Sequence, residues 1–195
     1  MLKKFLTRII LISTVLSVIG CGGLRYSQLD PAAKDYHPKR IAVFTADVGT
    51  FEEARQPIEQ IVPGVLMDKK WFSDVTDTAS LNRQMNSNPE LNKTMVDYLA
   101  KLNTVNYSDA ALSKKIGELT KTDAFLLVAV DFWNYTVEKD KLAKVSIGLK
   151  LIDAETGKIM WKAGHQLKKT YTFFKPELAD VARSVVSDMV NEMPH

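Results

Sequence analysis

The sequence predicts an α/β domain with a mixed five-stranded sheet and helices packed mainly on one face, and three observations lead to this fold class. First, short apolar or alternating stretches typical of strands lie at 39–47, 71–76, 125–130, 145–151 and 159–167. Second, apolar residues at helical spacing lie at 51–62, 91–102, 108–119 and 176–193. Third, the two kinds interleave in the order β-α-β-α-α-β-β-β-α. We therefore expect a single domain at 39–195.

The first half of this domain alternates between strands and helices. The stretch "KRIAVFTAD", Lys39 to Asp47, is rich in β-branched residues and predicts the first strand. The helical pattern at 51–62 contains Pro57, which we expect to interrupt or shift the helix. A short second strand follows at 71–76. Asn88 and Pro89 then offer an N-cap and an N1 proline to the next helix, whose apolar stripe is Leu91, Met95, Tyr98, Leu99 and Leu102.

Two further helices complete the prediction. Ser108 is expected to cap a helix whose stripe is Leu112, Ile116 and Leu119. The last helix is expected to start near Pro176, and its stripe is Leu178, Val181, Val185, Met189 and Met193.

Between these helices the pattern predicts three consecutive strands. "FLLVAV", Phe125 to Val130, is apolar at every position, as is typical of a central strand covered on both faces. A charged turn at 138–141 follows. From Val145 to Leu151 apolar and polar residues alternate, which predicts a strand with one solvated face.

The connection between the last two strands predicts their register. Glu155-Thr156-Gly157 fits a three-residue hairpin loop that is closed by a glycine in the left-handed region. Such a loop places Leu151 opposite Trp161, and Ile147 opposite His165.

The amino-terminal stretch predicts an exported, acylated protein. Lys3, Lys4 and Arg8 precede an apolar run of 11 residues, 9–19, which is shorter than the ~20 that span a bilayer. A secretory signal at 1–20 fits this pattern. The run ends in "VIGC", 18–21, which resembles the lipobox of bacterial lipoproteins and implies that Cys21 is acylated with fatty chains such as palmitate. The alternative is an accidental cysteine behind an uncleaved hydrophobic anchor.

Charge and cysteine content limit the classes of partner. The three basic residues of the signal account for the whole excess of 26 Lys and Arg over 23 Asp and Glu, so residues 21–195 are neutral and give no reason to propose nucleic acid. Cys21 is the only cysteine, so we expect no disulfide. Residues 21–38, with Gly, Pro and no clear period, predict the lipidated cysteine and a tether. By similarity to sorted lipoproteins, Gly22 in place of an aspartate favours the outer membrane, at its periplasmic face, and the inner membrane and the cell surface stay open as alternatives.

The middle of the chain resembles a known family. "IGELTKTDAFLLVAVDFW" and "KVSIGLKLIDAETGKIMWKAG" look like the core of the CsgG/LpoB-type periplasmic lipoproteins, with Asp123-Ala124 as the pair before a buried strand. "HPKRIAVF", 37–44, resembles the first strand of that family. The resemblance implies a fold related to the amino-terminal domain of TolB and no catalytic site. The matched residues are fold determinants, so no functional role is carried over from them.

The chain also departs from the better-known members of this family. Pore formers add membrane-spanning strands with a lipid-facing apolar row. The outward row here contains Lys144, Lys150, Lys162 and Lys168, which argues against a pore. Activators of penicillin-binding proteins have long disordered linkers, whereas the predicted tether is short.

We find no catalytic or metal-binding pattern in the sequence, and we expect neither a cofactor nor an enzyme. His37, His165 and His195 are too scattered to form a zinc site, and we expect His165 to pack at the edge of the core. No phosphate-binding or nucleophile motif occurs. Asp131 lies in a strand beside apolar neighbours, so it is either a buried catalytic carboxylate or an outward-facing residue beside Gly148.

One surface is a candidate for binding a protein or an anionic glycan. Strict alternation places Trp133 and Tyr135 on the solvated face, beside the lysine row Lys144, Lys150, Lys162 and Lys168 and near Gly148 and Gly164. Aromatic rings over a flat basic sheet suit a partner contact. The alternative is that Trp133 only covers the glycines of its own sheet.

These features predict a non-enzymatic, membrane-anchored adaptor or assembly factor in envelope biogenesis, with an envelope protein as its partner. The alternative is a lipid- or solute-binding auxiliary subunit of an envelope transporter. A deep apolar cavity between helices and sheet would favour that alternative, whereas a packed core would favour the adaptor.

Overall fold

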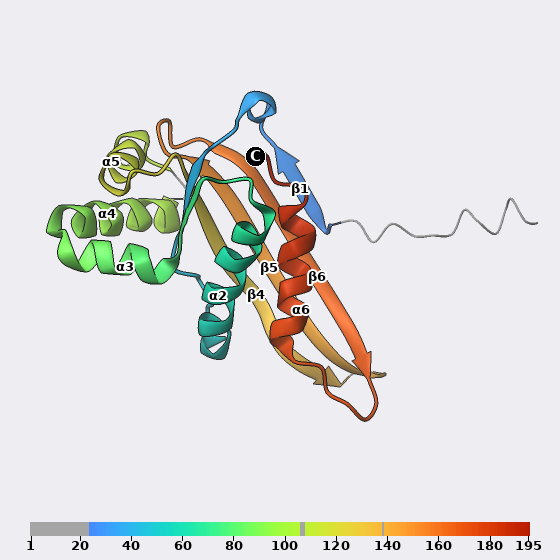
Figure 1. The fold of residues 1–195 in the computed structure, drawn as a ribbon. Coiled ribbons are helices and arrows are strands. Elements are labelled where there is room, and N and C mark those ends of the chain that lie inside the picture. Colours follow the sequence, from blue (N-terminus) through green and yellow to red (C-terminus); the bar gives the residue numbers. More distant parts are fainter. Residues whose placement is uncertain (1–23, 106–107, 138) are drawn as a thin grey trace, which may run out of the picture.

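The fold is that of a computed structural model, which describes residues 24–105, 108–137 and 139–195. Over these residues the chain forms a six-stranded sheet in the order β1-β6-β5-β4-β2-β3 (Figure 1). The strands are β1 (Tyr26–Leu29), β2 (Arg40–Val43), β3 (Asp74–Thr76), β4 (Ala124–Val137), β5 (Lys141–Asp153) and β6 (Ile159–Tyr171). The helices are the 3-10 helix η2 (Pro31–Asp35), α2 (Glu52–Lys69), α3 (Thr78–Ser87), α4 (Pro89–Val105), α5 (Ala110–Thr120) and α6 (Leu178–Val190).

The predicted mixed α/β class is confirmed, but the strand count and the element order are wrong. The sixth strand is β1, and α3 is a helix that the sequence pattern missed because little of it is apolar. Strand β2 runs parallel to β3 and β4, and the remaining neighbours are antiparallel. None of the helices among the described residues is long and apolar enough to cross a membrane.

Strand β1 lies within the stretch predicted to be a tether, and that part of the prediction is wrong. Residues 26–29 pair antiparallel with β6, from Tyr26 opposite Gly164 to Leu29 opposite Trp161. The indole nitrogen of Trp161 donates a hydrogen bond to Ser27 Oγ at 3.1 Å. The domain therefore begins before residue 39, because this edge strand needs β6 as its partner.

The central hairpin follows the predicted register. Leu151 lies opposite Trp161, and Ile147 opposite His165, as the loop chemistry predicts. Gly157 has a φ of 68°, in the left-handed region. The backbone amide of Gly157 donates to the carbonyl of Asp153 at 2.8 Å, which closes the turn.

The helix termini agree with the sequence in part. Asn88 caps α4 as predicted, since its side-chain oxygen accepts from the amides of Glu90 and Leu91 at 3.1 and 3.2 Å. The cap of α5 is Asp109 rather than Ser108, one residue later than predicted. Helix α2 continues through Pro57, contrary to expectation, because its buried face is held against the sheet and α6.

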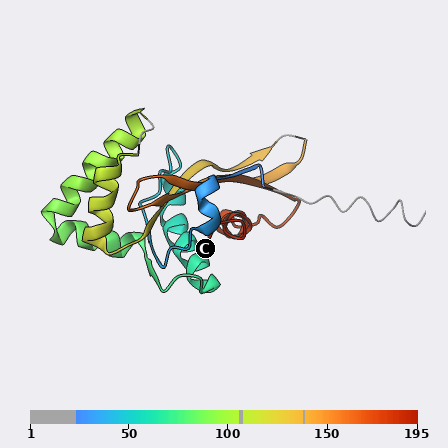
Figure 2. The same ribbon diagram turned by 90° about the horizontal axis from the view of Figure 1, so that it is seen from above.

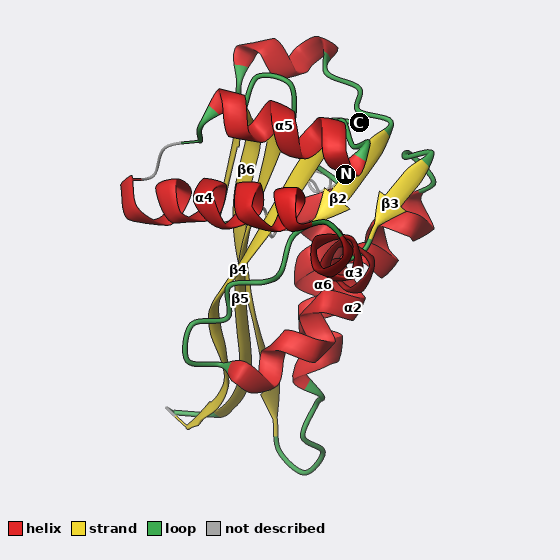
Figure 3. Cartoon of the chain, turned by 90° about the vertical axis from the view of Figure 1, so that its left-hand side faces the viewer, coloured by secondary structure: helices red, strands yellow, loops and turns green. Residues whose placement is uncertain are grey.

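Helices cover both faces of the sheet, so the predicted packing mainly on one face is wrong. Helices α2 and α6 pack on one side, which we call the first face, with the odd-numbered residues of β5. Helices α3, α4 and α5 pack on the other side, the second face, against Ala42, Phe125 and Ile152. Figures 2 and 3 show that α4 and α5 lie across only one end of β4, β5 and β6. The other end of the second face carries no helix in the described structure.

A β-bulge in β4 changes which residues face the core. Val130 lies opposite Ile147, and Phe132 opposite Ser146, so Asp131 is an extra residue. Before the bulge the even-numbered residues of β4 face α2 and α6, and after it the odd-numbered residues do so. One added residue therefore exchanges the two faces for the rest of the strand.

Asp123 fixes the start of β4 against the start of β2. Its carboxylate accepts from the backbone amides of Lys39 and Arg40 at 3.1 and 2.9 Å, and from the Arg40 guanidinium at 2.7 Å. The hydrogen bond from the Arg40 side chain lowers the pKa of Asp123. The Asp123-Ala124 pair is thus a structural element, in agreement with its role as a fold determinant.

Candidate functional site

The predicted exposure of Trp133 is wrong. Trp133 lies opposite Val145 on the first face and is only 3% exposed, within the core that α2 and α6 cover. Tyr135 lies on the same side, opposite Ala143, and is half-buried. Its hydroxyl donates to the carbonyl of Pro176 at 2.9 Å, and burial raises its pKa. The bulge at Asp131 is the physical reason, because it turns both rings away from the predicted surface.

The four predicted lysines do lie on the second face, in two directly opposed pairs. Lys144 faces Lys168 across β5 and β6, and Lys150 faces Lys162. Between these pairs lie Ser146 opposite Gln166 and Gly148 opposite Gly164.

The ring over the two glycines belongs to Tyr26, not to Trp133. A Cβ on Gly164 would lie 2.3 Å from Tyr26 Cε1, so only a glycine permits this ring to approach β6 so closely. A Cβ on Gly148 would lie 3.9 Å from the Tyr26 hydroxyl. We call Tyr26 with Lys144, Lys150, Lys162 and Lys168 the basic surface.

A hollow of about 280 Å³ opens next to Tyr26 on the same face. Its floor includes Gly148 and Ala129, and Leu102 of α4 contributes to its lining. Asp47, Asp131 and Lys150 add charged groups of both signs to the lining. The hollow is open and small, and its polar groups suit a contact with one side chain or one small polar group of a partner.

The lysine pairs carry an electrostatic cost. Like charges directly opposite each other across a sheet are destabilising. Among the described residues, Lys150, Lys162 and Lys168 take part in no ion pair, whereas Lys158 and Lys115 have carboxylate partners. Lys144 contacts the Phe132 ring, with its Nζ 4.3 Å from the ring centroid. The basic surface therefore presents positive charge without a direct ion pair among the described residues, although Asp47 and Asp131 line the hollow beside Lys150.

Asp131 is exposed rather than buried, which agrees with the outward-facing alternative. Its carboxylate accepts from Ser146 Oγ at 3.3 Å. His165 is buried on the first face with its Nε2 3.5 Å from Asp188 Oδ2, so it packs at the core edge as predicted. The described residues contain no group of three or more His, Cys, Asp or Glu that could hold a metal ion. Cys21 lies outside the described residues.

Two residues of this site were missed by sequence reasoning. The sequence pattern places Tyr26 in the tether and Asp47 at the end of the first strand. One signal was present: two glycines directly opposite each other on a solvated face leave a flat gap that an aromatic side chain can cover. Nothing in the sequence identified β1 as the source of that ring.

The fold is shared with solved bacterial proteins at low sequence identity. The PelC dodecamer from Paraburkholderia phytofirmans is 16% identical, with a TM-score of 0.58 over 87% of this chain and 98% of that chain. Lipoprotein GNA1162 from Neisseria meningitidis is 15% identical, with a TM-score of 0.50 over 80% of this chain and 100% of that chain. No family model and no curated protein matches the chain. The likeness therefore establishes a fold that a bacterial lipoprotein also adopts.

Proposed function

We propose that the chain is a lipoprotein of the CsgG/LpoB type, acylated at Cys21 and held on the periplasmic face of the outer membrane. There it acts without catalysis, as an adaptor or assembly factor that binds an acidic surface of an envelope protein. The lipobox-like sequence before Cys21 and the fold shared with a Neisseria lipoprotein support the anchored class.

The binding role is supported by one observation: the basic surface contains two pairs of directly opposed lysines. Lys144 faces Lys168, and Lys150 faces Lys162, across β5 and β6 on the second face. Folding alone gives no reason to keep like charges directly opposed, since each pair reduces stability. An acidic partner would neutralise both pairs, and the opposed charges would then contribute to binding and to the rate of association.

The filled core also supports an adaptor over a carrier of lipid. Side chains between the sheet and helices α2 and α6, such as Ile58, Val145 and Val185, are fully buried against one another.

The hollow beside Tyr26 favours the second candidate function, a protein that binds a small solute, because the hollow joins an aromatic wall to carboxylates and a lysine. The likeness to a dodecameric protein adds a second copy of this chain to the partners to be tested.

Crosslinking in cells tests the binding role. A photo-crosslinking residue replaces Gln166, which lies between the lysine pairs, and the captured protein is identified by mass spectrometry. We expect Lys150→Ser with Lys162→Ser to reduce capture by roughly tenfold or more, since a binding hot spot is worth ~2 kcal/mol. The control is Lys34→Ser with Lys93→Ser, which removes two exposed lysines elsewhere. Equal capture by the two variants would contradict the role of the basic surface.

The anchor has its own test. Cys21→Ser should abolish labelling by an alkynyl fatty acid and release the protein from the outer membrane, since the acyl chains provide stable attachment. Unmutated protein that takes up no alkynyl fatty acid, or a Cys21→Ser variant that is still labelled, would disprove acylation at Cys21 and leave the basic surface to be judged separately.

A further inference from the structure

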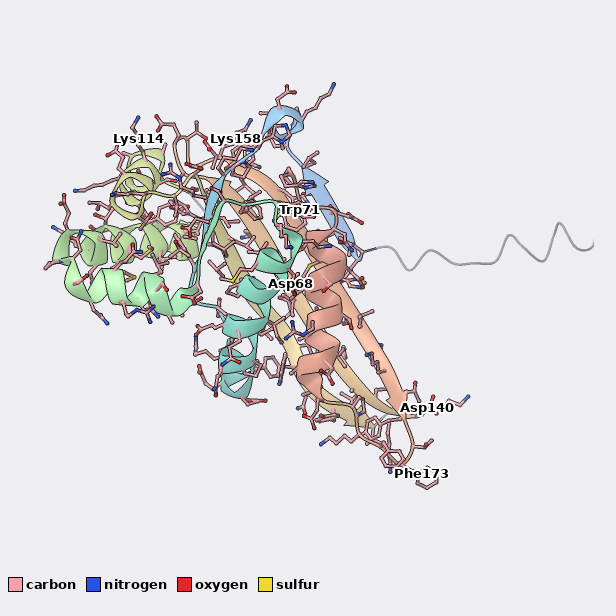
Figure 4. The ribbon with its side chains drawn as sticks, in the orientation of Figure 1. Asp68, Trp71, Lys114, Asp140, Lys158 and Phe173 are labelled. Atoms are coloured by element: carbon pink, nitrogen blue, oxygen red, sulfur yellow. The ribbon has the colours of Figure 1, made fainter. Side chains whose placement is uncertain are left out.

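The end of the molecule away from α5 bears the most exposed large apolar side chains that the structure describes. Phe173 and Phe174, in the loop between β6 and α6, are 93% and 92% exposed. Val137, at the end of β4, is 77% exposed. Figure 4 shows Phe173 at the same end as Asp140, which belongs to the turn between β4 and β5. We call Val137, Phe173 and Phe174 the apolar tip.

Packing within the domain does not account for this tip. Large apolar side chains are usually buried, and one exposed alone is unremarkable. Two adjacent phenylalanines with almost no protein contact are different, because their burial elsewhere would remove a large apolar area from water. Exposed patches of this kind mark interaction surfaces.

The residues behind the tip indicate what it contacts. The rings of Tyr135 and Tyr171 meet edge to face at 6.0 Å, and Lys175 Nζ lies 3.4 Å from the centroid of the Tyr135 ring. The two segments that end here, 137–141 and 168–177, contain five lysines and three acidic residues. Apolar rings at the apex with tyrosines and lysines behind them follow the distribution of side chains across a bilayer surface. The lysines suit acidic phospholipid headgroups.

The direction of β1 brings the proposed anchor toward the same end. Because β1 is antiparallel to β6, the chain before Tyr26 approaches from the half of β6 that leads to the tip. The five residue-to-residue steps from Cys21 to Tyr26 span at most ~18 Å. The seven residues from Gly164, opposite Tyr26, to Tyr171 span ~23 Å of strand. The two lengths are comparable, so a chain anchored at Cys21 is long enough for the tip to reach the same bilayer.

We infer that the apolar tip inserts Phe173 and Phe174 into the surface of an anionic lipid bilayer, as a membrane contact additional to the acyl anchor. Two separated contacts restrict the orientation of the domain at the membrane more than the acyl anchor does alone. The inference shares only the anchor at Cys21 with the proposed function and is independent of the basic surface.

Site-specific fluorescence on the intact acylated protein tests this insertion. Phe173→Cys is labelled with an environment-sensitive fluorophore and reconstituted into vesicles of phosphatidylethanolamine and phosphatidylglycerol. Cys21 is the only native cysteine and is blocked by acylation in the lipoprotein, so the new thiol is the single labelling site. The matched control carries the label at Val96→Cys, a 57% exposed apolar position on α4. Unmutated protein that takes up the label would show a free Cys21 and contradict the anchor, not the tip.

We expect the label at 173 to brighten several-fold, to shift to the blue and to be quenched by spin-labelled lipids, while the label at 96 reports water. Adding Phe174→Ser, or using phosphatidylcholine alone, should weaken the signal at 173. The thermal midpoint should stay unchanged, because both rings are outside the core.

Three results would overturn the inference. The first is quenching of the label at 173 by aqueous iodide while the protein stays on the vesicles. This result would contradict insertion of the tip but not the acyl anchor. The second is a label shielded from both iodide and spin-labelled lipid, since a protein surface would then cover the tip. The third is equal lipid quenching at 96 and 173, since the fluorophore would then drive the insertion.

Discussion

Replacing Trp133 by alanine separates the two possible registers of β4. With the bulge at Asp131, the ring lies in the core opposite Val145, and its removal leaves a large cavity. Truncations of this kind cost ~3–5 kcal/mol. A domain of this size loses ~2–4 °C of midpoint per kcal/mol, so Trp133→Ala should lower the thermal midpoint by roughly 6–20 °C. With strict alternation the ring would be exposed, and Trp133→Ala would change the free energy of unfolding by no more than about 0.5 kcal/mol in either direction.

Thermal and urea unfolding of the purified protein, followed by far-ultraviolet circular dichroism, measures this difference. Val137→Ala is the matched control, because Val137 is an exposed apolar residue at the end of the same strand. Its midpoint should stay within about 2 °C of the unmutated protein, from an effect of at most ~0.5 kcal/mol. If Trp133→Ala and Val137→Ala shift the midpoint equally, the bulge and the faces assigned to β4 are wrong.

Three further predictions concern the hairpin, the lysine pairs and pH. Gly157→Val places a β-branched residue at a φ of 68°, and the strain of ~1–3 kcal/mol should lower the thermal midpoint; an unchanged midpoint would contradict the turn. Lys162→Glu converts the like-charged pair with Lys150 into a pair of opposite charges. It should raise the free energy of unfolding by ~0.2–1 kcal/mol and reduce partner capture. A lower free energy of unfolding would show that the opposed lysines do not destabilise the domain. The Arg40 guanidinium lowers the pKa of Asp123. The ionised carboxylate therefore stabilises the fold fully at pH values above ~4, the usual pKa of an aspartate. This contribution to the free energy of unfolding is lost as the pH falls through the lowered pKa of Asp123. Unfolding of Asp123→Asn between neutral and acid pH should then show a shallower pH dependence than the unmutated protein, and parallel curves would refute the linkage.

The sequence by itself determined the elements whose signals are local. The loop that ends at Gly157 sets the register of β5 and β6, because the turn geometry and the alternation on both sides of it agree. Asn88 starts α4 because its side chain caps amides only two and three residues away. The stripe Leu178, Val181, Val185 and Met189 is buried as predicted, since helical spacing alone gathers these residues on one side of α6; Met193 is also buried but lies beyond the end of the helix.

Some errors concerned signals that were present but ambiguous. The residues of β4 that face α2 and α6 change from even to odd numbers at Asp131, but the run before it is apolar at every position, so the sequence shows this change only through Trp133, Tyr135 and Val137 and does not distinguish a bulge from strict alternation. Asp77 caps α3 by accepting from the Ser80 amide at 2.7 Å, and an aspartate before a helix is a recognised signal. Little else in α3 is apolar, so the periodicity did not reveal the helix.

Only the tertiary structure decided which surfaces are open. The stripe of α4 shows that one side of the helix is buried, but not which face of the sheet buries it, because both faces offer apolar rows. Strand β1 exists only through its hydrogen bonds to β6, more than 130 residues later in the chain. These long-range pairings cover part of the second face and leave Lys168 exposed and Lys144, Lys150 and Lys162 half-buried there. A local pattern contains no information about them, since their free energy comes from contacts between segments far apart in the sequence.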